Sequence, residues 1–402
     1  MSLRPAWILL GIAGVLLLLA LLQLLTGADD LASSGTLQAT VIAAVPIALA
    51  GLGGLWSERA GVVNIGLEGM MILGTFGAGF GGFFYGPWGG VLGAALLGAV
   101  GGLIHAVATV SFGVDHIVSG VAINIIALGA TQYLAAQVFS GLSGGGSTQS
   151  PTLGDVPTFT VPGLSGLLGA VEERELFFVS EVAAFVRALT TDVSVLVLIA
   201  VALFVLTWYV LWHTAFGLRL RSCGESPAAA ESLGVNVYRY KFVAVLTSGA
   251  LAGLAGGFLA LVASSNYRDG QTGGRGYIGL AAMIFGNWRP GGMLVGSGLF
   301  GYTDTLRLRS GGESVHALLA LVAVLLAAAA FWQWRRSQRV AAGVSVAVAV
   351  ATAAWFFSTV SVPGDFTSMT PYVTTLLVLA LASQRLRMPA ADGMRYRRGS
   401  AG

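Results

Sequence analysis

The sequence has little charge, few histidines and a single cysteine. Charged residues make up 10% of its 402 positions, against roughly 25% in soluble domains. The lone Cys223 excludes an internal disulfide, and the four histidines show no metal-ligand spacing, so neither thiol chemistry, a metal nor another cofactor is indicated. The phosphate-binding pattern G-x-x-x-x-G-K-[ST] is also missing, which excludes ATP binding by a P-loop in this chain.

Apolar residues are abundant instead. They account for 55% of the chain, and apolar runs of about 20 residues, the length that crosses a bilayer, recur along it. We therefore predict an all-α integral membrane protein, a polytopic helical bundle of about 10–12 transmembrane segments with broken or re-entrant helices. The net charge of +3 does not indicate nucleic-acid binding, because the basic residues gather in a few loops, as orientation by the positive-inside rule requires.

The most informative stretch reads WSERAGVVNIGLEGMMILG, from Trp56 to Gly74. It interrupts apolar runs with Glu58, Arg59, Asn64 and Glu68. Polar groups at membrane depth usually face a bundle interior or a water-filled path, and irregular backbone survives there only where it lines a cavity. We therefore expect Asn64 and Glu68 to line a translocation pathway. An alternative of equal weight is that Glu68 pairs with a basic or amide group and holds helices together.

A second polar position lies within HAVATVSFGVDHIVSGVAINIIALG. Asn124 is included in the expected pathway, although an interhelical hydrogen bond explains an intramembrane amide equally well. Asp115 and His116, which precede it, favour a helix start over a direct transport role. Glycines spaced four residues apart, as at Gly98 and Gly102, indicate close packing between helices.

Two long polar segments separate the apolar runs. Residues 141–192 begin with a stretch rich in glycine, serine, threonine and proline, and their acidic side chains outnumber their basic ones. They are expected to form an extracytoplasmic loop with a short helix on the membrane surface or on the bundle. Residues 215–241 carry four basic side chains and are expected in the cytoplasm. Within them Ser226 suits an N-cap, Pro227 a first helical position and Gly234 the end of a helix. A helix of about two turns is expected there, too short to be stable without a docking partner.

The last third contains another interruption. The run from Tyr277 to Trp288 is too short to span a bilayer and ends in NWRPGG, which indicates a discontinuous element that lines a cavity. Its aromatic residues Tyr277, Phe285 and Trp288 fit an aromatic belt at the membrane interface better than a stacking site for a ring-shaped cargo. Three apolar runs follow, at 315–334, 340–360 and 371–382. The turn RRSQR at 335–339 is expected in the cytoplasm, and so is the tail 388–402, which is also expected to be disordered.

Five blocks of the sequence resemble a known family. They are SERAGVVNIGLEGMMILGTFGA, HAVATVSFGVDHIVSGVAINIIALG, GLRLRSCGESPAAAESLGVNVYRYK, SGALAGLAGG and IGLAAMIFGNWRPGG. In this order they resemble the permease subunits of bacterial ABC importers for nucleosides, which belong to the ribose and branched-chain amino acid permease group. The resemblance covers most of residues 36–306 and resumes at MTPYVTTLLVLAL.

The resemblance implies a nucleoside permease of the bacterial cytoplasmic membrane, with a simple sugar such as ribose or galactose as the alternative cargo. It implies four kinds of partner: a second homologous permease, usually in a heterodimer, a cytoplasmic ABC ATPase, an extracytoplasmic substrate-binding lipoprotein, and membrane lipid. The short helix at 226–234 would be the coupling helix that enters a cleft of the ATPase. The expected coupling residues are Arg219, Arg221, Gly224, Glu225, Pro227, Ala228, Ala229 and Gly234.

The chain as a whole is expected to be one transmembrane permease domain, 1–402. Residues 315–360 depart from the family pattern and are interpreted as an inserted transmembrane hairpin. An intramembrane enzyme would need paired carboxylates, metal ligands or an activated serine, so we expect no catalytic residue, and ATP hydrolysis belongs to a separate subunit. A scaffold would not need polar residues at membrane depth, and a passive channel would not need a coupling loop.

Overall fold

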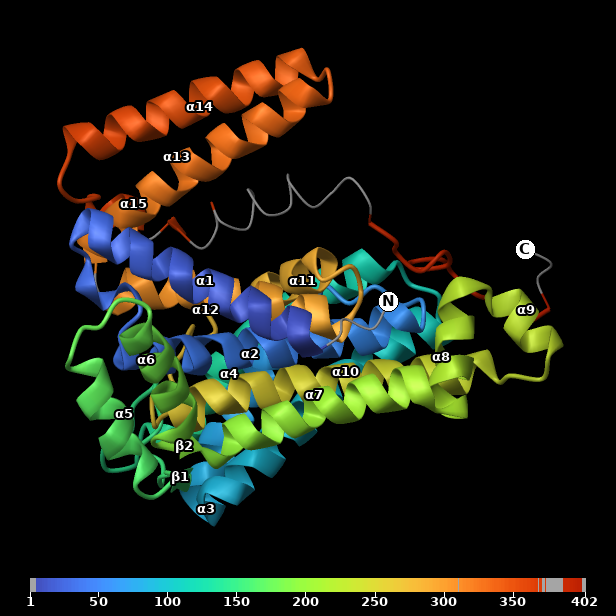
Figure 1. The fold of residues 1–402 in the computed structure, drawn as a ribbon. Coiled ribbons are helices and arrows are strands. Elements are labelled where there is room, and N and C mark those ends of the chain that lie inside the picture. Colours follow the sequence, from blue (N-terminus) through green and yellow to red (C-terminus); the bar gives the residue numbers. More distant parts are fainter. Residues whose placement is uncertain (1–4, 310, 368, 371–372, 374–385, 400–402) are drawn as a thin grey trace. The chain divides into compact units, whose positions relative to one another are not determined.

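The computed structural model describes residues 5–309, 311–367, 369–370, 373 and 386–399 (Figure 1). These residues are mainly helical, with one two-stranded sheet formed by β1 (Thr158–Phe159) and β2 (Val193–Ser194). The helices are α1 (Pro5–Thr26), η1 (Asp29–Leu31), α2 (Ser34–Arg59), α3 (Leu67–Ala106), η2 (Val107–Ser111), α4 (His116–Phe139), α5 (Leu164–Glu172), α6 (Val179–Thr190), α7 (Val195–His213), α8 (Ala215–Glu225), α9 (Pro227–Ser232), α10 (Val237–Phe258), η3 (Leu259–Ala263), α11 (Arg275–Phe285), α12 (Pro290–Arg309), α13 (Gly311–Arg335), α14 (Arg339–Ser358) and α15 (Gly364–Thr367).

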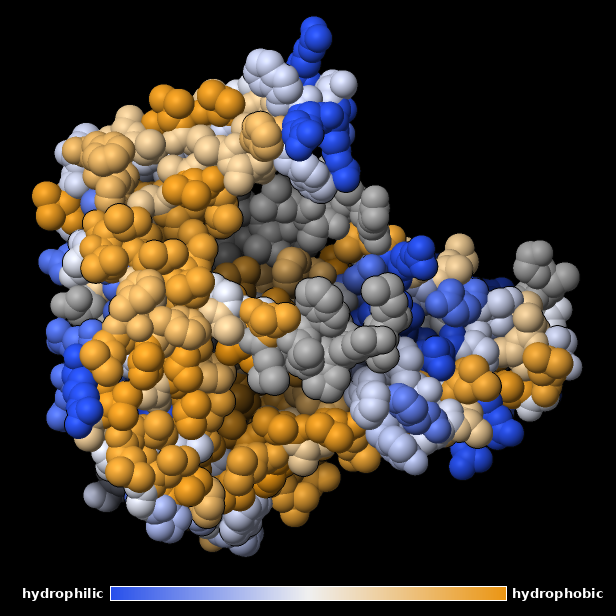
Figure 2. Space-filling view, viewed as in Figure 1, coloured by the Kyte–Doolittle hydropathy of each residue, from blue (hydrophilic) through white to orange (hydrophobic). Residues whose placement is uncertain are grey.

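Seven helical segments in the described part of the chain are long and apolar enough to cross a membrane. Their outward side chains are hydrophobic, as the orange areas of Figure 2 show. A soluble protein does not expose apolar surface on this scale. The prediction of an all-α, polytopic membrane protein is therefore confirmed.

The longest of these segments, α3, is a hairpin of two helices. Gly86 has φ 76° and ψ 179°, a conformation that favours glycine, and it reverses the chain direction. Across the hairpin Gly77 faces Gly93 and Gly81 faces Gly89 so closely that a Cβ on Gly81 would collide with the carbonyl oxygen of Gly89. The two halves of α3 therefore run antiparallel, and each has the length of a separate span.

Glycines also join α10 to α3. Gly249 packs against Gly98 and Gly102, and Gly253 packs against Ala94 and Gly98, with backbone atoms in the place that a Cβ would take. The spacing of small residues predicted this close approach. Helices α3 and α10 therefore pack backbone against backbone.

The chain divides into two compact units. Unit 1 consists of residues 1–41, 159–193 and 302–374, and unit 2 consists of residues 42–158, 194–301 and 375–402. The core of unit 2 includes Leu52 of α2, Phe204 of α7 and Phe300 of α12. Every residue that the sequence marks for translocation or coupling lies in unit 2.

In unit 1, α13 and α14 form a helical hairpin with a turn at 336–338. The backbone N–H of Val362 donates to the carbonyl of Gly312 at 3.0 Å, so the two ends of the hairpin lie together. The expected apolar runs 315–334 and 340–360 fall on these helices. The run expected at 371–382 lies outside the described residues, apart from Val373.

The polar segment 141–192 contains two short helices, α5 and α6, where one was expected. Glu172 of α5 accepts hydrogen bonds from Ser34 N and from Arg187 Nη1, both at 2.8 Å. Ala183, Ala184 and Ala188 give α6 a buried face. The part of this segment that carries α5 and α6, residues 159–192, therefore packs within unit 1 through an ion pair and an alanine face.

Candidate translocation and coupling sites

The stretch from Trp56 to Gly74 forms the end of α2, a non-helical break at 60–66 and the start of α3. Gly61 has φ +81°, which a residue with a side chain rarely adopts. The break is held by two histidines. His105 Nε2 lies 3.0 Å from the carbonyl of Val63, and His116 Nδ1 accepts from the Val63 N–H at 3.3 Å. The sequence prediction of irregular backbone at this point is correct.

Asn64 lies within the break and is fully buried, with 0% of its surface exposed. Its Nδ2 donates to Ser248 Oγ of α10 at 2.8 Å and to Met70 Sδ at 3.4 Å. Its Oδ1 is buried without a hydrogen-bond partner in the described part of the chain. Asn64 thus joins the break to α10 in this conformation, and no open path reaches its side chain.

Glu68 opens α3, and its carboxylate caps another helix. It accepts from Gly274 N at 3.0 Å and from Gly276 N at 2.7 Å, at the N-terminus of α11. The positive end of the helix dipole favours a carboxylate there. Gly276 leaves the necessary room, because a Cβ would lie 2.6 Å from the Cα of Glu68. This geometry matches the interpretation in which Glu68 holds helices together, with backbone amides as its partners.

Asn124 of α4 links the break to α11. Its Oδ1 accepts from Gly69 N at 2.7 Å, and its Nδ2 donates to Ile65 O at 3.1 Å and to Tyr277 Oη at 2.9 Å. Glu68 and Asn124 therefore meet at adjacent residues of α11, while Asn64 faces α10. Tyr277 is 46% exposed and is the part of this polar cluster that solvent reaches.

Asp115 acts as a helix start, as predicted. Its carboxylate accepts from Ile117 N at 2.9 Å and from Val118 N at 3.1 Å and caps α4. The hydrogen bond from the backbone of Val118 is the main reason why the pKa of Asp115 lies below its ordinary value.

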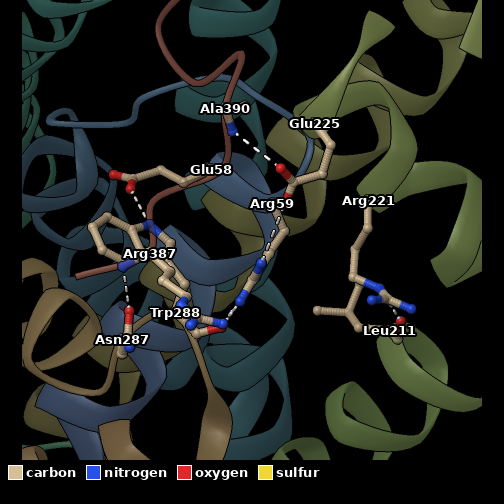
Figure 3. A network of polar contacts seen from close by, with 9 residues as sticks. All are labelled: Glu58, Arg59, Leu211, Arg221, Glu225, Asn287, Trp288, Arg387 and Ala390. Carbon is tan, nitrogen blue, oxygen red and sulfur yellow. Dashed lines mark hydrogen bonds and ion pairs between the residues drawn. The ribbon is translucent and has the colours of Figure 1, made fainter. Parts of the chain in front are cut away.

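A second polar cluster lies at the other end of the break, where α2 finishes (Figure 3). The guanidinium of Arg59 donates to the carbonyl of Trp288 through Nε at 3.1 Å and Nη2 at 2.6 Å, and Trp288 Nε1 donates to Glu58 Oε2 at 2.6 Å. Arg59 Nη1 lies 3.9 Å from Glu225 Oε1 of α8. This cluster joins the end of α2, the turn between α11 and α12, and α8.

Trp288 does not belong to an aromatic belt. It is 4% exposed, has φ +53°, and points its indole N–H at a carboxylate. The turn NWRPGG breaks the helix as predicted, because α11 ends at Phe285 and α12 begins at Pro290. Neither lipid nor cargo reaches the Trp288 indole in this conformation, so the expected belt position is wrong for this residue.

The expected short helix is present as α9, which lies between α8 and α10 (Figure 1). Pro227 is its first residue. Gly234, at φ +81°, ends it with bonds from Gly234 N to Glu231 O at 2.8 Å and from Val235 N to Ala230 O at 3.0 Å. The Ser226 hydroxyl makes no capping hydrogen bond, contrary to expectation, although its carbonyl accepts from Ala230 N at 3.0 Å.

The alanines of α9 do not share one face. Ala228 and Ala229 are exposed, whereas Ala230 is buried against Cys223 and Val237. Leu233, just beyond the helix, is 85% exposed. Of the three alanines, Ala228 and Ala229 are therefore open to a partner, together with the exposed Ser232 and Leu233.

The coupling residues before α9 lie on α8, a helix that the sequence analysis did not identify. Arg219 is exposed, whereas Arg221 donates from Nε to Leu211 O at 2.9 Å and lies 5.6 Å from the ring of Trp212. Gly224 is buried so tightly that a Cβ would meet the carbonyl of Arg59. Arg221 and Gly224 thus position α8, and Arg219 and Glu225 face outward. Burial raises the pKa of the Cys223 thiol to about 11.

The tail is not disordered over 388–399, contrary to expectation. Ala391 and Asp392 are buried, and Ala391 N donates to Gly224 O at 2.8 Å. Disorder was expected because terminal segments are usually poorly ordered, but hydrogen bonds to α8 and α9 order this one. Residues 400–402 lie outside the described residues.

Comparisons with known proteins identify the family. The family described as "Branched-chain amino acid transport system / permease component" matches residues 36–329. The guanosine ABC transporter permease protein NupQ of Bacillus subtilis (strain 168) is 33% identical over 374 residues, which cover 90% of this chain and 96% of NupQ. The nucleoside ABC transporter permease protein NupC of Lactococcus lactis subsp. cremoris (strain MG1363) is 35% identical over 366 residues, covering 89% of this chain and 94% of NupC.

A third relative is named for a different cargo. The putative glucose ABC transporter permease protein TsgC13 of Haloferax volcanii is 37% identical over 284 residues, covering 69% of this chain and 78% of TsgC13. No solved structure matches the chain. The apolar helices, the broken segment at 60–66 and the near full-length similarity lead to one conclusion: this multi-pass membrane protein belongs to the family of permease components of branched-chain amino acid transport systems.

Proposed function

We propose that the chain is the permease subunit of an ABC importer that carries nucleosides across the cytoplasmic membrane. The observation that carries this proposal is the similarity, over about nine tenths of the chain, to two permeases named for guanosine and nucleosides. The chain itself performs no ATP hydrolysis. A separate ABC ATPase, a second homologous permease and an extracytoplasmic substrate-binding lipoprotein complete the importer.

The polar cluster of Glu68, Asn124 and Tyr277 is the proposed translocation site. Glu68 is engaged by backbone amides, so its part is to hold α11 against α3. Asn124 and the exposed Tyr277 offer an amide, a hydroxyl and an aromatic ring, which are groups that suit a nucleobase. Asn64 holds the break to α10, and we propose that its unpaired Oδ1 gains a partner when the break moves.

The exposed face of α9 is the proposed contact with the ATPase. Helix α9 has only six residues and gains little from propensity, so it suits a docking element. The basic segment 215–241 then lies in the cytoplasm and residues 141–192 lie on the other side.

Transport assays decide the cargo. The chain is reconstituted with a second permease, an ATPase and a substrate-binding lipoprotein of the importer, and uptake of labelled guanosine is compared with that of labelled ribose, galactose and glucose. Guanosine uptake that requires ATP is the expected result. The similarity to TsgC13 favours a sugar as the second candidate, and uptake of a sugar without guanosine uptake would replace the proposal.

Coupling is tested at Ala229. Ala229→Trp adds bulk to the exposed face of α9 and should abolish both uptake and transport-linked ATP hydrolysis, while the lipoprotein still docks. Ala215→Trp, at an exposed alanine of α8 outside the coupling residues, is the matched control and should keep both activities. If cysteines placed at Ala228 or Ala229 never crosslink to the ATPase in the assembled importer, the coupling assignment is wrong.

A further inference from the structure

The ordered C-terminal segment, residues 386–399, is here called the strap. It crosses unit 2 at the end that carries α8 and α9 (Figure 1), and it lies beside the cluster around Arg59 that Figure 3 shows. The strap has no regular secondary structure of its own, so it is ordered by contacts with other elements.

The strap contacts both helices of the proposed coupling region. On α8, Ala391 N donates to Gly224 O at 2.8 Å and Ala390 N donates to Glu225 Oε2 at 3.2 Å. On α9, Glu231 is held by Arg398 Nε at 3.4 Å and by Gly399 N at 3.4 Å.

Tyr396 makes a further contact with α9. Its side chain hydrogen-bonds to Glu231, and this bond is the main reason why the pKa of Glu231 is lowered. The Tyr396 ring centroid lies 5.3 Å from that of Tyr238 at the start of α10. The one acidic side chain of α9 is therefore engaged by the strap and is not free to pair with another protein.

The strap also contacts the helix break. A Cβ on Gly61 would lie 3.1 Å from the carbonyl oxygen of Ala391, and a Cβ on Gly393 would lie 3.4 Å from Val63 Cγ2, so strap and break lie in direct contact. Arg387 N donates to Asn287 Oδ1 at 2.7 Å in the turn between α11 and α12. One short segment thus connects α9, α8, the break and the start of α12.

The buried centre of these contacts is Asp392. Asp392 is 8% exposed, and both oxygens of its carboxyl group lack a hydrogen-bond partner in the described part of the chain. The carboxyl group of Glu58 on α2 lies next to it, and Lys241 of α10 and Arg59 of α2 supply nearby positive charge. Lys241 Nζ itself donates to Gly61 O at 3.2 Å. Burying a carboxyl group without hydrogen bonds is costly, so this contact depends on the positive charges beside it and on the protonation of the two carboxyl groups.

We propose that the strap supports the surface that receives the ATPase: it fixes α9 in its docking position and ties it to the break between α2 and α3. The inference rests on the proposed role of α9. Helix α9 is too short to hold its own orientation, and the strap supplies the missing support. Movement of the ATPase against α9 then reaches the break through backbone contacts of Ala391 as well as through α8.

The experiment displaces the strap with one substitution. Ala391→Trp puts a large ring where a methyl group is buried, and Met388→Trp, at a side chain that is 55% exposed, is the matched control. Limited trypsin cleavage after Arg395, Arg397 and Arg398 in the purified permease measures strap release. Cleavage should be several-fold faster in Ala391→Trp than in the wild type or in Met388→Trp.

The same variants are then assembled with the ATPase. Crosslinking from Ala228→Cys to the ATPase, and the uptake obtained per ATP hydrolysed, should both fall several-fold in Ala391→Trp and stay at the wild-type level in Met388→Trp. A variant that lacks 386–402 should match Ala391→Trp. Equal binding of the second permease by all variants shows that the chain is still folded.

Two results overturn the proposal. One is a strap that stays protected from trypsin in Ala391→Trp, because burial of Ala391 would then not be what holds the strap in place. The other is a released strap with normal crosslinking and normal coupling. If Ala228→Cys fails to crosslink even with the native strap in place, the proposed role of α9 has failed, which is a different outcome from failure of the strap alone.

Discussion

Glu68 is a carboxylate among apolar helices, and its two hydrogen bonds to the start of α11 predict how it responds to substitution. Glu68→Ala removes both acceptors and should lower the free energy of unfolding by about 2–4 kcal/mol. Glu68→Gln keeps one acceptor and should lose about half as much. Thermal unfolding in detergent measures the loss, and uptake should fall in the same order because α11 is loosened.

Glu173→Ala is the control for Glu68, since Glu173 is an exposed acidic residue of unit 1. Unchanged thermal stability of Glu68→Ala would contradict the capping role. A stable, assembled Glu68→Ala protein without uptake would show instead that the carboxylate acts on the cargo.

Asp392 predicts a pH dependence of strap docking. Burial raises its pKa to about 7, against an ordinary value of 3.8. The docked strap therefore holds the proton more tightly than the free strap, so docking is strongest below pH 4, weakens as the pH rises to about 7, and changes little above that.

Hydrogen exchange of the Ala391 amide, corrected for its intrinsic rate, measures this docking. Exchange should be at least about tenfold faster at pH 8 than at pH 5, since each pKa unit corresponds to a factor of ten. Asp392→Asn stays neutral and should exchange slowly at both values. Equal pH dependence in the two proteins would exclude Asp392 as the titrating group.

Among the elements, the α13–α14 hairpin is predicted to be dispensable for transport. Most of α14 is exposed within unit 1, and Val362 N and Gly312 O already meet at 3.0 Å, so a short linker can replace 315–360. The deleted protein should insert and retain measurable uptake. Complete loss of uptake in a protein that still inserts would show that the hairpin takes part in transport or assembly.

At the scale of the whole molecule, charge predicts orientation. Figure 2 shows hydrophilic side chains gathered at the end that carries α8, α9 and the strap, and the basic residues in this region favour the cytoplasm. In a Cys223→Ser background, cysteines at Arg219 and Ser337 should react with an impermeant maleimide only after the cytoplasmic side is opened. A cysteine at Asp155 should react from outside in intact cells.

The three positions are exposed, so reactivity reports sidedness. Labelling of Arg219→Cys and Asp155→Cys from the same side would overturn the assignment of both loops. Labelling of Ser337→Cys from outside would overturn only the cytoplasmic turn of the hairpin.

The sequence by itself determined the features that depend on composition and on neighbouring residues. The lengths of the apolar runs predicted the membrane-spanning helices, and Gly61 and NWRPGG marked the helix breaks. Pro227 and Gly234 predicted the ends of α9 to within a residue. These signals are local: a cap, a backbone conformation or the length of an apolar run acts within a few residues of the chain. The resemblance to nucleoside permeases was also contained in short blocks of sequence.

Only the tertiary structure decided which polar groups meet. The partners of Glu68 are backbone amides more than 200 residues away in sequence, at a separation of 206 for Gly274. Trp288 and Glu58 are likewise distant, separated by 230 positions, and Ala390 of the strap meets Glu225 across 165 positions. No local pattern specifies such pairs, because they form only after the helices have packed and the buried polar groups must find donors and acceptors within reach.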